Sequence, residues 1–186
     1  MAEFEASLNT EKSADCSVPR WMNVIAPVEP LVGDPEMTWL EQAQDGRATA
    51  ALWSSPPALV VPLSYRKHVA LDAVCAAFAS RGLPVRLRRS GGGVVPQGPG
   101  ILNLSLAYPC SRAFGIAPVQ VYAHLCGVLA AALASLDINC TTGAVEGSFC
   151  DGRYNLAVAV DGIARKIAGT AQYWRRSGGQ PAVLAH

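Results

Sequence analysis

The chain has 186 residues, of which 51% are hydrophobic and 16% are charged, and its formal net charge is +1. This length can bury a core without disulfides or metals, and the near-neutral charge excludes a general electrostatic attraction to nucleic acid or anionic lipid. We therefore expect a globular domain that recognises its ligands through local chemistry, with neither nucleic acid nor a membrane among its partners.

The cysteines and the N-terminal residues indicate in which cellular compartment the protein is located. The six cysteines show no C-x-x-C pair and no histidine spacing typical of a zinc site, so we predict reduced thiols and no metal. The N-terminus lacks the segments of a secretory signal, which favours a cytoplasmic location. A stretch without formal charge lies between Arg112 and Asp137, but Pro118, Gln120 and His124 interrupt it. This composition predicts a core helix rather than a membrane span.

The N-terminal part divides into a tail and the start of one domain. Residues 1–18 are polar and lack periodicity, so we expect a disordered tail, followed by a single domain over residues 19–186. Asp34, Pro35 and Glu36 match an N-cap, a favoured first helical residue and an acidic first turn. A helix is therefore predicted from there to the next glycine.

Strands and a second helix follow. Apolar runs at 48–53 and 58–61, separated by Ser-Ser-Pro-Pro, predict two strands joined by a turn. Ser64 is expected to cap a helix that ends at Gly82. Alternation of apolar and polar residues predicts a strand at 102–107.

The last third contains a long helix and a hairpin. Pro118 is expected in the first turn of a helix that continues to Leu136 and has one apolar stripe. An Asp-Gly dipeptide favours a tight turn between strands at 154–160 and 163–174.

A glycine segment is the first candidate for a functional site. Arg88 and Ser90 are followed by Gly91, Gly92 and Gly93, between two predicted strands. Glycine weakens a strand interior, so such a cluster marks either a flexible turn or a close backbone approach to a ligand. Backbone N–H groups beside arginine would suit a carboxylate or a phosphate. The residues alone do not distinguish a flexible turn from a ligand-binding loop.

Lys166 is the second candidate. It lies in IARKIAGTAQ, where period-two alternation places it on one face with Ala164 and Ala168. These alanines and the nearby Gly169 have small side chains and leave space around the lysine that a packed core would fill. Such space is typical of a ligand-binding slot. The alternative is a solvent-facing strand lysine, which the pattern alone favours because lysine is mostly exposed.

Four motifs in this order, RRSGGGVV, GPGILNLSL, GSFCDGRYNLAV and RKIAGTAQ, resemble the catalytic domain of the biotin/lipoate protein ligase family. The resemblance implies an α+β fold with a mixed, largely antiparallel sheet flanked by helices, distantly like a class II aminoacyl-tRNA synthetase core. It implies an enzyme that attaches lipoate or octanoate to a lysine of a carrier domain. The carriers implied are lipoyl domains of 2-oxoacid dehydrogenase E2 subunits and the glycine cleavage H protein.

The same resemblance assigns the site residues. Lys166 would hold the acyl carbonyl or acyl phosphate and stabilise developing negative charge. Gln97 stands where the family commonly has a histidine, and an amide cannot act as an acid or base. The chain looks shorter than the family at its C-terminal end, and His186 receives no catalytic role because a terminal residue is a poor base unless something holds it. The pocket is implied to be lined by Arg88, Ser90, Gly91, Gly92, Gly93, Gln97, Asn103, Gly169 and Thr170.

Two enzymatic mechanisms and one non-enzymatic role stay open. The first is a ligase that uses ATP and magnesium to form an acyl-adenylate, and the extent of the motif match favours it. The second is ATP-free octanoyl transfer through a thioester on Cys150, because GSFCDGRYNL is similar to the segment that carries the thiol of the family's cysteine-dependent octanoyltransferases. A cation such as Lys166 beside this thiol would raise its thiolate fraction. The third is a non-catalytic module that binds an acyl group or a carrier domain.

Overall fold

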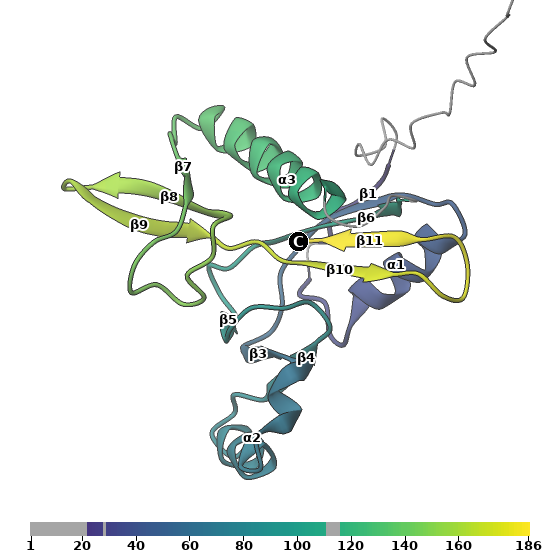
Figure 1. Ribbon diagram of the computed structural model, residues 1–186. Helices are drawn as coiled ribbons and strands as arrows, with labels where there is room; N and C mark the ends of the chain where they lie inside the picture. Colours follow the sequence, from purple (N-terminus) through teal and green to yellow (C-terminus); the bar gives the residue numbers. More distant parts are fainter. Residues whose placement is uncertain (1–21, 28, 111–115) are drawn as a thin grey trace, which may run out of the picture.

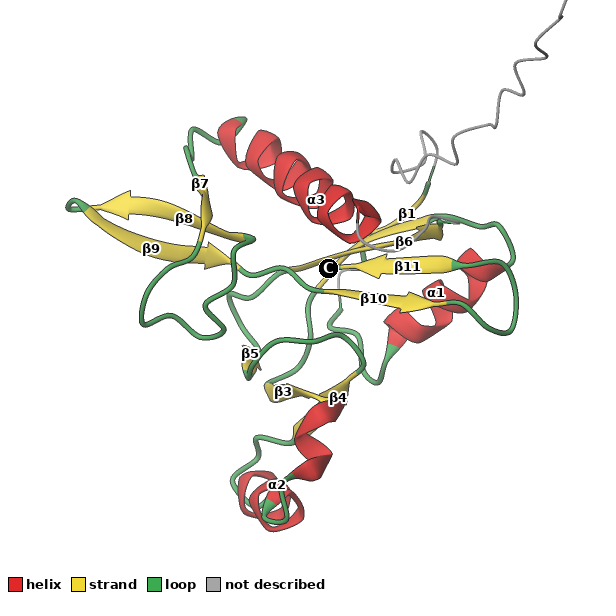
Figure 2. Ribbon diagram, viewed as in Figure 1, coloured by secondary structure: helices red, strands yellow, loops and turns green. Residues whose placement is uncertain are grey.

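The chain has an α+β fold, as predicted, in which helices pack on small sheets (Figures 1 and 2). The computed structural model describes residues 22–27, 29–110 and 116–186, and the tail predicted over residues 1–18 lies outside that range. In chain order the elements are β1 (Asn23–Ile25), α1 (Pro35–Gln44), β2 (Thr49–Trp53), β3 (Ala58–Pro62), the 3-10 helix η1 (Leu63–Lys67), α2 (Leu71–Ala79), β4 (Val85–Arg88), β5 (Val95–Gln97), β6 (Asn103–Pro109), α3 (Ile116–Ala134), β7 (Thr141–Gly143), β8 (Asn155–Val160), β9 (Ile163–Ala168), β10 (Gln172–Arg175) and β11 (Ala182–Ala185).

The described strands form three sheets rather than one. Sheet A has the order β1-β2-β6-β11-β10, sheet B the order β4-β3-β5, and sheet C the order β7-β8-β9. Only the β1–β2 and β3–β4 pairs are parallel among these strands. This is the mixed, largely antiparallel arrangement that the sequence resemblance implies.

The core lies on both faces of sheet A. In β6, Leu106 and Tyr108 belong to the apolar cluster beneath α3, whereas Ala107 belongs to the cluster beneath α1. In β11, Val183 and Leu184 divide between the two clusters in the same way. Because successive strand residues point to opposite faces, α1 and α3 cover opposite sides of the sheet (Figure 1). The central strands are therefore fixed by packing from two directions.

The α1 prediction is confirmed, but two other helix predictions are wrong in part. Ser64 does not cap α2, because it lies within η1, and the backbone N–H of His68 closes that short helix on the Tyr65 carbonyl before α2 begins. The helix predicted to continue to Leu136 ends at Ala134, and Val128 and Leu136, which the prediction placed on its apolar stripe, are exposed. The buried α3 positions lie in its N-terminal half, where it packs against sheet A.

The β8–β9 hairpin is confirmed, but the strand predicted at 163–174 is interrupted. Asp161 and Gly162 both have positive φ, as the tight turn requires. The segment leaves sheet C after Ala168, where β9 ends, and joins sheet A as β10, which begins at Gln172. Periodicity alone does not show which sheet each half joins, because the alternation is the same in both.

The cysteines differ from the prediction in one respect. Cys75, Cys126, Cys140 and Cys150 are free, as predicted, but Cys110 is disulfide-bonded. Pairing depends on the distance between residues far apart in the chain, which spacing in the sequence does not report. In the part of the chain that the structure describes, no helix combines the length and the hydropathy that a membrane span requires.

Candidate active site

The loop between β4 and β5 carries the Ser-Gly-Gly-Gly segment. The guanidinium of Arg88 turns back onto this loop, where Nη2 donates to the carbonyl oxygens of Gly91 and Gly93, both at 2.8 Å. Gly92, between them, has a φ of 105°, which residues with a side chain rarely adopt. Residues 89–94, which we call the glycine loop, therefore have a conformation that Arg88, the residue before the loop, stabilises by hydrogen bonds.

Cys150 lies in the connection between β7 and β8, and its side chain is exposed. Its φ of 53° lies in the left-handed region that is uncommon for residues other than glycine. The carbonyl oxygen of Cys150 accepts hydrogen bonds from Asn155 Nδ2 at 3.2 Å and from Lys166 Nζ at 3.1 Å. Such contacts hold a conformation that costs free energy, and positions of this kind cluster at functional sites.

Lys166 extends from β9 to the Cys150 connection. Its ammonium donates to the carbonyl oxygens of Phe149 and Cys150. Burial lowers the pKa of Lys166, whereas Cys150 and Asp151 act in the opposite direction. Gly169 provides the room for the side chain, because a Cβ at this position would lie 3.0 Å from Lys166 Cε. The lysine thus occupies a slot bordered by glycine, the arrangement that its small neighbours in the sequence suggested.

The glycine loop approaches the side chain of Cys150, and Arg88 and Lys166 lie near the same residue. A Cβ at Gly92 would lie 3.0 Å from Cys150 Sγ, and one at Gly93 would lie 3.3 Å from Cys150 Cβ, so glycine lets the loop approach the thiol. Arg88 and Lys166 both interact electrostatically with Cys150, while burial lowers the pKa of the Arg88 guanidinium. An accessible thiol beside cations is the environment of a reactive cysteine.

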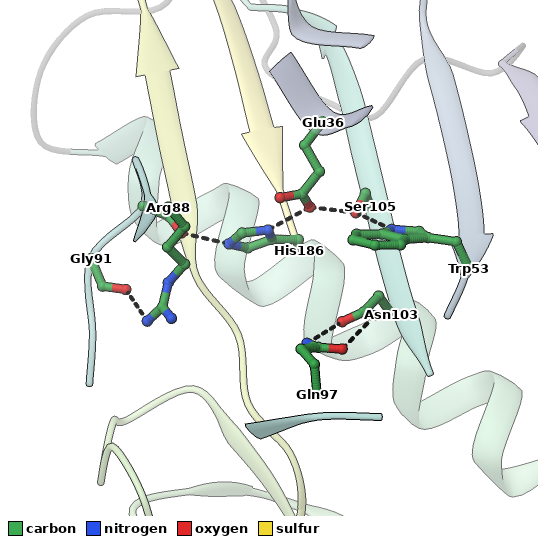
Figure 3. A network of polar contacts seen from close by, with 9 residues as sticks. Glu36, Trp53, Arg88, Gly91, Gln97, Asn103, Ser105 and His186 are labelled. Carbon is green, nitrogen blue, oxygen red and sulfur yellow. Dashed lines mark hydrogen bonds and ion pairs between the residues drawn. The ribbon is translucent and has the colours of Figure 1, made fainter. Parts of the chain in front are cut away.

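The other residues assigned from the sequence have partners within the protein. Ser90 is buried, and its Oγ lies 2.7 Å from His186 Nε2. Gln97 and Asn103 exchange two amide hydrogen bonds, at 2.9 and 3.0 Å, which join sheet B to sheet A (Figure 3). Thr170 donates to the Tyr154 carbonyl at 2.7 Å. Their contacts with substrate stay predictions.

A second polar group, which we call the Glu36 network, consists of Glu36, His186, Ser90, Ser105 and Trp53. His186 Nδ1 lies 2.6 Å from Glu36 Oε1, on the side of the ring opposite the Ser90 contact (Figure 3). Ser105 donates to the same carboxylate oxygen at 2.6 Å and accepts the Trp53 Nε1–H bond at 3.0 Å. The network joins α1, β2, β6 and the end of β11 to the glycine loop.

The pKa of Glu36 determines the direction of these hydrogen bonds. Burial would raise this pKa, but the charge of His186 and the hydrogen bonds from His186 and Ser105 outweigh burial and lower it. Glu36 is therefore an ionised acceptor, and the proton it shares with the imidazole belongs to Nδ1. The other ring nitrogen, Nε2, then shares a hydrogen bond with the Ser90 hydroxyl, which it accepts in the neutral imidazole and donates in the imidazolium.

Glu36 and His186 are the residues that sequence reasoning missed. The first-turn pattern explains Glu36 as a helix feature alone, and nothing near His186 in the sequence supplies a group to hold it. The two residues are 150 positions apart, and the packing of α1 against β11 brings them together. The continuous apolar run Ala182–Ala185 before His186 does not show which element it packs against.

A polar cavity of about 260 Å³ lies beside this network, between α1 and β10. Arg89 lies over the ring of Tyr173, with 6.0 Å between its guanidinium carbon and the ring centroid, and Arg175 pairs with Glu41 at 3.1 Å. Within residues 22–27, 29–110 and 116–186, no group of three His, Cys, Asp or Glu side chains is placed to hold a metal ion. The cavity is lined by Met37, Glu41, Arg89, Tyr173, Arg175 and Ser177.

Comparison with known sequences matches residues 36–180 to the lipoyl protein ligase A/B catalytic domain. A protein of Cupriavidus necator described as uncharacterized is 54% identical over 81% of this chain and 63% of its own length. An octanoyl-GcvH:protein N-octanoyltransferase of Kyrpidia tusciae is 35% identical over 84% of this chain and 54% of its own length. A protein of the same name from Geobacillus kaustophilus is 30% identical over 70% of this chain and 44% of its own. The chain thus spans less than two thirds of these relatives.

Solved structures show the same fold at low sequence identity. A putative lipoate protein ligase from T. acidophilum with bound lipoic acid has a TM-score of 0.62 at 15% identity, over 88% of this chain and 66% of that chain. A lipoate-protein ligase A bound with ATP has a TM-score of 0.60 at 16% identity, over the same shares of 88% and 66%. At these identities the similarity extends to the fold alone.

Proposed function

Because the chain belongs to the lipoyl protein ligase A/B catalytic domain family, we propose that it is an acyltransferase that transfers an octanoyl group to a lysine of a lipoyl carrier domain through a thioester on Cys150. The observation that carries the proposal is the setting of the thiol, which is exposed on a left-handed backbone and adjoins Arg88, Lys166 and Gly92. Two relatives, at 35% and 30% identity, are named octanoyl-GcvH:protein N-octanoyltransferases, which supports the same choice.

The first step loads Cys150. Its thiolate attacks the carbonyl carbon of an octanoyl thioester on a donor carrier, and a tetrahedral oxyanion forms. The carrier's C–S bond then breaks, its sulfur leaves with the electron pair and takes a proton from water, and the octanoyl group stays on Cys150. Lys166 would stabilise this oxyanion. The hydrogen bonds of its ammonium to the carbonyl oxygens of Phe149 and Cys150 support this role, because the ammonium could donate to the oxyanion in place of one of these carbonyls.

The second step transfers the group to the acceptor. The neutral ε-amine of a carrier-domain lysine attacks the carbonyl carbon of the Cys150 thioester, forming a C–N bond. The C–S bond breaks, the thiolate of Cys150 is restored, and the amine nitrogen gives its proton to water. Transfer from an acyl carrier that bears octanoyl as a thioester to a lysine of a lipoyl carrier domain balances without ATP, because a thioester is exchanged for an amide.

An ATP-dependent ligase is the second candidate. The cavity lined by Arg89 and Arg175 favours it, because guanidinium groups suit phosphate oxygens. A ligase of similar fold was solved with ATP bound. In this mechanism ATP, with magnesium, would activate lipoate or octanoate as the adenylate, and Cys150 would not be required.

Intact-mass measurement separates the two candidates. The protein is incubated, without ATP, with a carrier that bears octanoyl as a thioester, and we expect a hydroxylamine-labile octanoyl adduct that is absent from Cys150→Ser. Cys75→Ser, which removes a free thiol on α2, is the matched control and should keep the adduct. Labelling of an acceptor domain that requires ATP, with no adduct on the protein, would contradict the thiol mechanism and support the ligase.

A further inference from the structure

We propose that His186, held by Glu36, is a positioning residue that fixes the glycine loop against Cys150 through its hydrogen bond to Ser90. The inference deepens the proposed function and rests on it for its catalytic consequence. Its structural basis is the chain of contacts from Glu36 Oε1 to His186 Nδ1 at 2.6 Å and from His186 Nε2 to Ser90 Oγ at 2.7 Å.

The burial of Ser90 distinguishes a positioning role of these contacts from a catalytic one. A serine, a histidine and a carboxylate in this order resemble the arrangement that activates a serine nucleophile. A nucleophile has to reach its substrate, and Ser90 is only 2% exposed, whereas Cys150 is exposed. The network is therefore suited to holding the glycine loop rather than to attacking a substrate.

The glycine loop has two anchors that tie it to different sheets. Arg88 bonds two carbonyls of the loop, but it belongs to β4 and so connects the loop only to sheet B. The bond from Ser90 to His186 connects the loop to the end of β11, which lies between β6 and β10 in sheet A. Glu36 orients the imidazole from α1, on the face of sheet A that this helix covers.

Loss of the hydrogen bond between Ser90 and His186 should affect the Cys150 thiol, because Gly92 and Arg88 connect the glycine loop to this residue in the chain of contacts. Without Nε2, the buried hydroxyl of Ser90 lacks its hydrogen-bond partner, and the loop is expected to shift so that this hydroxyl can find another. A Cβ at Gly92 would lie 2.9 Å from Arg88 Nη2 and 3.0 Å from Cys150 Sγ, so the loop backbone at Gly92 adjoins both groups. A shift of this backbone displaces the guanidinium and opens the contact between the loop and the Cys150 side chain.

The test measures alkylation of Cys150 by iodoacetamide in full-length variants, read by peptide mass mapping with Cys75 as the internal reference. His186→Ala and Ser90→Ala should each change the rate of this alkylation about threefold or more, in the direction of slower reaction, because the loop and the guanidinium no longer hold their positions beside the sulfur. Octanoyl loading of Cys150 should slow in parallel. The double variant should be no slower than His186→Ala, because both substitutions remove the same bond. His124→Ala, at an exposed position on α3, is the matched control.

His186→Gln and a serine-reactive probe distinguish a positioning role from a loss of packing and from a serine nucleophile. His186→Gln keeps a hydrogen-bonding amide for Ser90 and should restore part of the rate, which a loss of packing alone would not. Unchanged alkylation in folded Ser90→Ala would overturn the inference even if His186→Ala fails to fold, as would labelling of Ser90 by a fluorophosphonate. Slower alkylation in the variants, combined with no octanoyl adduct on the parent protein, would support the positioning role and refute the proposed function.

Discussion

A methyl group at Gly169 should impair the site without unfolding the protein. A Cβ there would lie 3.0 Å from Cε and 3.1 Å from Nζ of Lys166, closer than ordinary van der Waals contact. Gly169 does not have a positive φ, so alanine introduces no backbone strain at this position. The crowded atoms are the far end of a long side chain, and the ammonium can therefore move away from its two carbonyl acceptors.

The size of the effect follows from those acceptors. A hydrogen bond from a charged donor contributes about 1.5–3 kcal/mol. If Gly169→Ala removes one such interaction in the transition state, kcat/KM for octanoyl transfer should fall roughly 10- to 100-fold. The free energy of unfolding should change by less than about 1 kcal/mol, because the displaced ammonium reaches solvent.

Octanoyl transfer to an acceptor domain and urea denaturation measure the two quantities. Gly143→Ala is the matched control, since a Cβ at Gly143 would meet nothing within 4 Å and the residue lies in β7 of the same sheet. Full activity in folded Gly169→Ala would show that transfer does not depend on the position of Lys166. A loss of stability above about 2 kcal/mol would show that the glycine serves the fold, because surface rearrangements rarely cost that much.

Two further predictions concern the contacts around the site. Glu36→Gln should lower the free energy of unfolding near neutral pH by about 1–3 kcal/mol, since it weakens a buried charge-assisted network. Because the pKa of Glu36 is lowered from 4.5, this deficit should be fully present above pH 4.5 and shrink as the pH falls through the lowered pKa, and urea titrations across that range check the sign. A double-mutant cycle of Gln97→Ala and Asn103→Ala should give a coupling free energy of about 1 kcal/mol in chemical denaturation, because the two amides bond each other. Additive effects would contradict the pairing.

Local patterns in the sequence predict those features that neighbouring residues determine. The turn at Asp161 and Gly162 and the helix that begins at Pro35 are of this kind, and both are confirmed. Ser64 fails as a helix cap because a 3-10 helix satisfies the same backbone groups over a shorter stretch. A serine alone does not distinguish the two.

The candidate site is predictable only where its chemistry shows in the sequence. Small neighbours indicated a slot around Lys166, and three glycines indicated a close backbone approach, which the structure places at the Cys150 thiol. The contact between Glu36 and His186 depends on the order of strands in sheet A and on which face α1 covers. Neither is encoded by periodicity, so the sequence alone could not reveal that buried network.

The distribution of the reacting groups over the sheets has a consequence for how a large substrate is admitted. Lys166 belongs to β9, and the Cys150 connection leads into β8 of the same sheet, whereas the glycine loop joins β4 to β5 in another. The β8–β9 hairpin projects from the body of the molecule in Figure 1, and Lys166 and Asn155 bond it to the carbonyl oxygen of Cys150. A displacement of this hairpin would therefore carry Cys150 and the ammonium together and change their separation from the glycine loop. Under the proposed function, such a displacement would admit the acceptor lysine between the two sheets while Lys166 keeps its bond to Cys150.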